Sequence, residues 1–180
     1  MGQENLTDKL EDILNLVNDW LKFAEAKNAI LLSACGLALW SLIRLVSNNN
    51  LSQFLSVYFS VLLVFLLASM TISLLSFWPN LKTPQKLIHN KNSKNGNLLY
   101  FGYLALISKD QLLSALSKAT NAKENSTIEI HTMYAEQIIT NSKITLAKYK
   151  LFGYAVKTTI CGLIISLLPA VFSTISCAGN

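Results

Sequence analysis

The chain alternates between stretches that mix polar with apolar residues and three stretches that are almost entirely apolar. One of them, 54–78, carries no charge over about 25 residues, which suffices to cross a bilayer because a helix rises about 1.5 Å per residue. A second apolar stretch, 29–47, is charged only at Arg44, and a third, 151–175, is charged only at Lys157. The pattern therefore predicts three transmembrane helices.

The segment before the first span has the pattern of an amphipathic helix. Apolar residues recur there at spacings of three and four. They are Leu6, Leu10, Ile13, Leu14, Val17, Leu21 and Ala24. No Gly or Pro occurs from there to Gly36, and Asn5 or Thr7 can cap the start. We expect one helix of about 40 residues, in which a stalk, 1–28, leads directly into the first span.

Two capping boxes predict further helix starts, since a Ser three residues before a Glu or Gln lets the two side chains satisfy each other's backbone N–H groups. They are Ser108 with Gln111 and Ser126 with Glu129. The first opens a short helix that ends near residue 121. The second opens a long helix from about 127 to 168, because the next proline is Pro169. This helix begins as a stalk and ends as the third span.

The aromatic stretch 98–107, with Tyr100, Phe101 and Tyr103 around Gly102, is too apolar for a surface loop and predicts a strand or a buried extended segment. Aromatic rings near lysines can stack a nucleobase, and they can also simply pack into a core. Both uses stay open at this point.

These elements predict an all-α membrane protein. Three transmembrane helices carry a small cytoplasmic helical head, which is formed by the stalk extensions of the first and third spans and by the region 79–150. We expect a single domain over residues 1–180.

Composition and charge agree with this interpretation and orient it. Hydrophobic residues make up 52% of the chain, charged residues 14%, and the mean hydropathy is +0.39. Ten lysines lie in 80–150 and three in 1–28, whereas Arg44 stands alone beside the turn between the first two spans. Because cytoplasmic segments carry the excess of Lys and Arg, we expect the N-terminus on the cytoplasmic side of the membrane and the C-terminus on the opposite side.

The residues offer little for catalysis or metal binding. Cys35 and Cys161 lie within apolar spans, and His89 and His131 each stand alone, so we expect no disulfide, no metal, no cofactor and no enzyme activity. An isolated His in a polar helix, such as His131, is a surface residue or a simple hydrogen-bond partner. Nothing indicates nucleic-acid binding.

The third span carries small residues at a spacing of four, Thr158, Gly162 and Ser166, which permit close helix packing. We expect this face to support a homo-oligomer.

Three stretches, in this order, resemble the transmembrane effector family of Pycsar bacterial antiphage defence. They are WLKFAEAK at 20–27, LLYFGYLA at 98–105 and AEQIITNSKITLAKYKL at 135–151. The resemblance extends from about 10 to 172. It implies a membrane effector that responds to a cyclic pyrimidine nucleotide, cUMP or cCMP, made by a partner cyclase, and that damages the inner membrane in abortive infection. The alternative is a ligand-independent pore-forming or scaffold protein.

Twelve positions match the motifs of the family. They are Trp20, Phe23, Lys27, Tyr100, Phe101, Gly102, Glu136, Gln137, Ser142, Lys143, Lys148 and Tyr149. The chain departs from the family at Glu25, where the family commonly has an Asp, at Asn28, where it has a small residue, and at Tyr103, where an acid is frequent. Trp20, Phe23, Gly102, Ser142 and Tyr149 are the positions among the twelve for which a structural role is an alternative.

For the others the resemblance implies nucleotide contacts. Lys27 and Lys143 would meet the phosphate, Tyr100 or Phe101 would stack the base, and Glu136 or Gln137 would pair with its polar edge. Lys148 would be a further nucleotide contact. In the other interpretation, Lys27 pairs with Glu136 or Glu25 as a structural bridge between the stalks.

Overall fold

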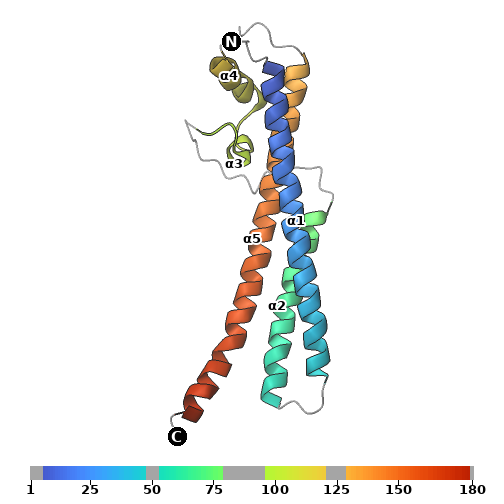
Figure 1. Ribbon diagram of the computed structural model, residues 1–180, viewed down its shortest axis with the longest axis vertical. Helices are drawn as coiled ribbons and strands as arrows, with labels where there is room; N and C mark the ends of the chain where they lie inside the picture. Colours follow the sequence, from blue (N-terminus) through green and yellow to red (C-terminus); the bar gives the residue numbers. More distant parts are fainter. Residues whose placement is uncertain (1–5, 48–52, 79–95, 121–128, 179–180) are drawn as a thin grey trace. The chain divides into compact units, whose positions relative to one another are not determined.

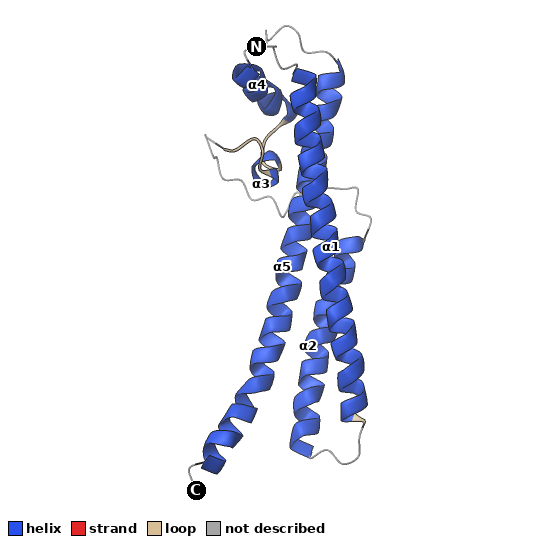
Figure 2. Ribbon diagram, in the orientation of Figure 1, coloured by secondary structure: helices blue, strands red, loops and turns tan. Residues whose placement is uncertain are grey.

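The computed structural model describes residues 6–47, 53–78, 96–120 and 129–178. Within these ranges the chain is all-helical and has no strand (Figures 1 and 2). The helices are α1 (Leu6–Val46), α2 (Gln53–Phe77), α3 (Phe101–Leu104), α4 (Lys109–Thr120) and α5 (Glu129–Ala178). Helices α1, α2 and α5 are long and apolar enough to cross a membrane, which confirms the predicted fold class.

The chain divides into two compact units. We call residues 1–24 and 79–149 the head unit, and residues 25–78 and 150–180 the membrane unit. Helices α1 and α5 contribute residues to both units.

The head unit is built on the apolar stripe predicted for the first helix. Its buried core consists of Leu6, Leu10, Ile13 and Val17 from α1, Leu104 of α3, Leu112, Leu113 and Leu116 from α4, and Ala135, Ile138 and Ile139 from α5. Helices α1 and α5 run parallel here, because Thr7 contacts His131 and Asn18 contacts Asn141. Burial of one face of each helix in this core is the main source of its stability.

Helix α4 begins as predicted. The backbone N–H of Gln111 donates to Ser108 Oγ at 3.2 Å, and the backbone N–H of Ser108 donates to Gln111 Oε1 at 3.0 Å. These two bonds confirm the first capping box. The second box involves Ser126, outside the described residues.

The strand predicted for 98–107 is wrong. Residues 101–104 form the short helix α3, and Phe101, Leu104 and Ala105 are buried at helical spacing rather than in alternation. The chain enters this helix through a turn in which Asn97 Oδ1 accepts the Leu99 N–H at 2.8 Å. A run of large apolar residues this short does not separate helix from strand by itself.

The boundaries of the two long helices also differ in detail from the predictions. Thr7 does not cap α1, because α1 begins at Leu6 and Thr7 Oγ1 contacts His131 Nε2 at 3.0 Å; Asn5 lies outside the described residues. His131 is therefore a hydrogen-bond partner, as expected, but in a buried rather than a surface position. Helix α5 continues past Pro169 to Ala178, since a proline can be accommodated in a membrane helix.

The membrane unit packs α2 against the second half of α1. Cys35, Leu62 and Leu66 are buried together, and Leu31, Ala38, Leu39, Leu42 and Met70 pack against them. Most of the large apolar side chains on the other faces of α2, such as Val64 and Leu67, are exposed on the surface of the unit, as expected for residues that contact lipid tails.

Candidate functional site

Five aromatic and motif residues from distant parts of the chain form one cluster in the head unit. Phe101 of α3 lies at its centre, with ring centroids 5.6 Å from Trp20 of α1, 4.9 Å from Tyr100 and 5.1 Å from Tyr149 of α5. Phe23 joins through Trp20, at 6.4 Å and edge to face. These residues come from all three motifs, which the fold therefore brings together.

The two rings predicted to stack a base differ in their exposure to solvent. Phe101 is only 6% exposed, and the ring of Tyr149 stacks on it with an interplanar angle of 22°. Tyr100 is 51% exposed. Phe101 is thus a packing residue, whereas the Tyr100 ring has a free area that a planar ligand can cover.

Gly102 holds Tyr100 in place through its lack of a side chain. A Cβ atom at this position would lie 2.5 Å from Tyr100 Cε1 and 2.7 Å from Cζ, so the ring lies directly against the glycine backbone. Any larger residue would displace the ring.

Tyr149 lies close enough to Tyr100 for the two to influence each other. Burial raises the pKa of the Tyr149 phenol, and the nearby Tyr100 raises it further, because both effects disfavour the phenolate. Tyr149 is therefore a neutral phenol at any physiological pH.

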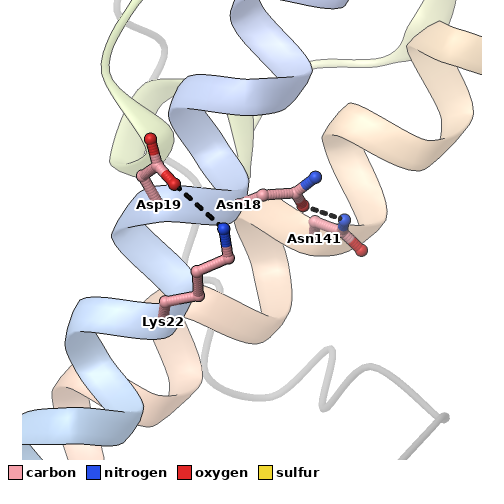
Figure 3. A network of polar contacts seen from close by, with 4 residues as sticks. All are labelled: Asn18, Asp19, Lys22 and Asn141. Carbon is pink, nitrogen blue, oxygen red and sulfur yellow. Dashed lines mark hydrogen bonds and ion pairs between the residues drawn. The ribbon is translucent and has the colours of Figure 1, made fainter.

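Polar side chains meet between α1 and α5, where Figure 3 shows Asn18 and Asn141 directed toward each other. Asn141 Nδ2 donates to Asn18 Oδ1 at 2.7 Å, and Gln137 Nε2 donates to Asn141 Oδ1 at 3.1 Å. On the outside of α1, Asp19 pairs with Lys22 at 3.2 Å. The Asn18–Asn141 contact favours one register of the two stalks, because a shift of either helix would leave the buried Asn141 amide without its partner on α1.

Ser142, also predicted from the motifs, directly follows Asn141 and is completely buried. Its Oγ has no hydrogen-bond partner among the described residues. Thr145, on the same face of α5, donates to the backbone oxygen of Asn141 at 2.7 Å. The buried face of α5 is therefore polar at the level where the apolar core ends.

The predicted ligand contacts on α5 lie on two different flanks of the helix. Glu136 and Lys143 are two turns apart on one flank, and Gln137 and Lys148 are three turns apart on another, about 100° away. Lys109 of α4 forms an ion pair with Glu136 at 2.5 Å, so α4 packs on the first flank. The hydrogen bond to Glu136 and its charge raise the pKa of Lys109.

Lys143 is half-buried on this first flank and makes no ion pair with the described residues. Lys27 lies in the membrane unit, with its Nζ 5.8 Å from the centre of the Phe152 ring. The bridge expected from Lys27 to Glu136 is not the pair that Glu136 makes, since its carboxylate binds Lys109.

The three positions predicted for helix packing lie on α5 in the membrane unit. Gly162 and Ser166 are buried and Thr158 is half-buried. A Cβ on Gly162 would lie 2.6 Å from Phe65 Cβ, so the helix that approaches closely is α2 of the same chain.

Sequence reasoning missed the polar residues that join elements. Asn18 and Asn141 were not singled out, nor was Lys109 as the partner of Glu136. Asn18 follows the buried Val17 directly, and Asn141 lies three residues after the buried Ile138. An asparagine at the edge of the apolar stripe of each helix is the sequence signal that could have predicted this contact. Among the described residues, no three His, Cys, Asp or Glu side chains gather as metal ligands would.

Two comparisons with known proteins identify the same family. A family model described as Pycsar effector protein domain matches residues 9–175. The Pycsar effector protein RsPycTM of a Rhizobium species is 29% identical over 166 residues, which cover 90% of this chain and 93% of that protein. No solved structure matches.

Proposed function

Because the chain belongs to the Pycsar transmembrane effectors of antiphage defence, we propose that it senses a cyclic pyrimidine nucleotide, cUMP or cCMP, and then impairs the inner membrane. The nucleotide comes from a cognate cyclase. The head unit is the sensor, the membrane unit is the effector, and the outcome is abortive infection.

The observation that supports this proposal best is the convergence of the three motifs in the head unit. Residues from α1, α3 and α5 that are up to 129 positions apart meet around Phe101. Of the two rings in the second motif, Phe101 is buried, whereas Tyr100 is half exposed and rests on Gly102 and Phe101. Base stacking on an exposed aromatic ring is a common mode of nucleotide recognition.

The geometry favours one set of ligand contacts over the other. Tyr100 opens α3, and α4, which follows it, packs on the flank of α5 that carries Glu136 and Lys143. In the proposal, Tyr100 stacks the pyrimidine and Lys143 binds the cyclic phosphate as a point charge. Gln137 and Lys148 lie on the other flank, and Gln137 is already bonded to Asn141. In the proposal, therefore, these two residues support the stalks rather than the ligand.

Ligand binding would act by a population shift. A nucleotide that binds one arrangement of α3 and α4 against α5 more tightly than another favours that arrangement. Helices α1 and α5 continue from the head unit into the membrane unit, so their packing is the element through which the shift can pass.

The decisive experiment reverses one charge. Lys143→Glu should lower the affinity for the nucleotide at least about tenfold, since one charge-assisted contact contributes about 1.5 kcal/mol or more. The measurement is calorimetric titration of the detergent-solubilised protein with cUMP and with cCMP. Lys118→Glu on α4 is the matched control, because it makes the same charge change at an exposed position outside the motifs.

Size-exclusion chromatography should give the same elution volume for both variants. Equal affinity of Lys143→Glu and the wild type would refute the assignment of Lys143. Membrane damage in cells that lack the cyclase, together with no binding of either nucleotide, would favour the ligand-independent pore-forming protein.

The proposal includes a topology with both N-terminus and head unit in the cytoplasm, and a homo-oligomeric assembly. Single cysteines can test the topology in a background without native cysteines. An impermeant maleimide added to intact spheroplasts should label Asn49→Cys and spare Ser93→Cys, because the first site lies in the outer turn and the second among the lysines. The reverse pattern would contradict the orientation. Crosslinking in the membrane tests the oligomer.

A further inference from the structure

One face of α2 changes from leucine to serine along its length. Leu62 and Leu66 are buried, and they are followed on the same face by Ser69, Ser73 and Ser76, which are also buried. The other faces of α2 carry mostly exposed apolar side chains, such as Leu67, 51% exposed. Polar side chains within membrane spans usually face the interior of the bundle, where they mark pathways for ions or protons.

Ser69 is the point where the three spans of the membrane unit meet. Its Oγ donates to the Ala155 oxygen of α5 at 2.9 Å and accepts a hydrogen bond from Thr159 Oγ1 at 2.8 Å. Cys35 Sγ of α1 lies 3.9 Å from Ser69 Oγ and 3.8 Å from Thr159 Oγ1. A chain of hydroxyl and thiol groups therefore joins α1, α2 and α5.

The second observation is the buried hydroxyl group of Ser73. It is 0% exposed, and its Oγ has no hydrogen-bond partner among the described residues. A serine with no protein partner contributes nothing to packing that an alanine would not contribute, and its exclusion from water is costly. Its position, one turn from Ser69 on the inner face of α2, suits a hydroxyl that hydrogen-bonds to transient water.

Asn28, near the start of the α1 segment of the membrane unit, continues the row of buried polar side chains. It is fully buried on α1. Cys35 lies beside Ser69, and α1 and α2 run antiparallel. Asn28, seven residues before Cys35, is therefore level with Ser76, seven residues after Ser69. We call Asn28, Ser69, Ser73, Ser76 and Thr159 the polar half of the membrane core.

The other half of this core is mainly apolar and tightly packed; Ser166, which is buried there, donates its hydroxyl to the Gly162 oxygen of its own helix at 2.6 Å. Leu62 and Leu66 are buried against α1, and α5 approaches α2 so closely that a Cβ on Gly162 would touch Phe65. Such a layer stops conduction because water does not enter a narrow apolar constriction. Leu66, one turn before Ser69, forms the boundary between the halves.

We propose that the interior of the membrane unit is a narrow route for water and protons, with the polar half as its entrance and Leu62 with Leu66 as its gate. This inference rests on the proposed function in that it supplies the means by which the membrane is impaired. In the proposal, separation of α2 from α5 wets the leucine layer and connects the serine hydroxyls to the opposite side.

The experiment measures proton flux into liposomes that contain the purified protein, using a pH-sensitive dye, a K⁺ gradient and valinomycin. Leu66→Ser should raise the flux at least about tenfold without any nucleotide, because it makes the gate polar. Leu67→Ser is the matched control: it is the next residue on α2 but faces outward, and it should give the wild-type flux. Release of trapped calcein should stay at the wild-type level in both variants.

A second variant keeps the test open if Leu66→Ser does not fold. Ser73→Ala removes the unpartnered hydroxyl at no cost to packing, so it should bind cUMP or cCMP as the wild type does but lower the nucleotide-triggered proton flux at least about tenfold. Wild-type flux in both Leu66→Ser and Ser73→Ala would overturn the inference. So would calcein release that rises with the proton flux, because it would indicate general disruption of the bilayer.

The outcomes separate this inference from the proposed function. If the nucleotide triggers flux in the wild type but neither variant alters it, the route is wrong and the sensor stands. If Leu66→Ser conducts protons but no nucleotide triggers the wild type, the route stands and the sensing proposal fails.

Discussion

Truncation of Phe101 to alanine is the most direct test of the head unit, because this ring holds three elements together. The side chain is 6% exposed and contacts the rings of Trp20, Tyr100 and Tyr149. Removal of a buried phenylalanine costs about 3–5 kcal/mol in lost burial and cavity formation. That is a large share of the roughly 5–15 kcal/mol that stabilises a typical domain.

The measurement is hydrogen–deuterium exchange of the detergent-solubilised protein, followed by mass spectrometry. In Phe101→Ala, the amides of residues 10–24 and 135–149 should exchange through an opening that is easier by about 3–5 kcal/mol, whereas those of α2 should be unchanged. Tyr100→Ala is the control, since a half-exposed ring should cost no more than about 1 kcal/mol. It should nevertheless lose nucleotide affinity if it stacks the base.

The reasoning would be refuted if Phe101→Ala changed the opening free energy by less than about 1 kcal/mol, the range of an exposed substitution. A loss of nucleotide affinity in Phe101→Ala without any change in exchange would mean that Phe101 is a ligand contact and not a packing residue.

Three further predictions follow from contacts in the two units. Gly162→Leu should lower the thermal stability of the detergent-solubilised protein because of the clash with α2, whereas Gly153→Leu should not, since a Cβ on Gly153 meets nothing within 4 Å. Asn141→Leu should destabilise the head unit by about 1–3 kcal/mol, measured by exchange, because it leaves the amide of its partner unsatisfied. The contribution of the Lys109–Glu136 pair to the free energy of unfolding should not change between pH 6 and 9. The pKa of Lys109 is raised, so this contribution is present below the ordinary value of 10.5 and is lost only as the pH rises through the raised pKa.

Each of these has a partner variant or an outcome that would contradict it. Phe65→Gly should partly rescue Gly162→Leu, because the closest contact of the new side chain is with Phe65 Cβ, an atom that only glycine lacks. Unchanged melting of Gly162→Leu alone would rule out the close approach. Asn18→Leu should recover much of the stability lost in Asn141→Leu, because the double variant has apolar side chains on both sides of the contact and no Asn18 amide is left unsatisfied. For the ion pair, a Lys109→Ala variant whose stability relative to the wild type changes between pH 6 and 9 would contradict the stated sign.

Much of the fold follows from local patterns. The uncharged run 54–78 has too little polarity for any soluble surface, and the capping box at Ser108 and Gln111 acts over three residues, so both were readable from the sequence. Helix α3 was not, because four residues are too few to display a helical period.

The site needed information that no local pattern contains. Asn18 and Asn141 are 123 residues apart, and only the register of two stalks brings them together. The motifs identified Tyr100 and Phe101 as a pair, but their different exposure depends on how Trp20 and Tyr149 close over one ring and not the other. Lys109 became the partner of Glu136 through the placement of α4, which the sequence does not specify.

The parallel pairing of α1 with α5 has a consequence for synthesis in the cell. In the head unit and, separately, in the membrane unit, the partners on these helices are about 124 positions apart. The α1–α2 hairpin can therefore enter the membrane early, whereas neither pairing can form before the ribosome has made α5. Until then the buried face of α1, with Leu10, Ile13 and Val17, lacks the part of its cover that α5 provides. We expect this face to be more accessible to proteases during that time. Chains that stall during translation should be degraded, so that complete copies alone accumulate.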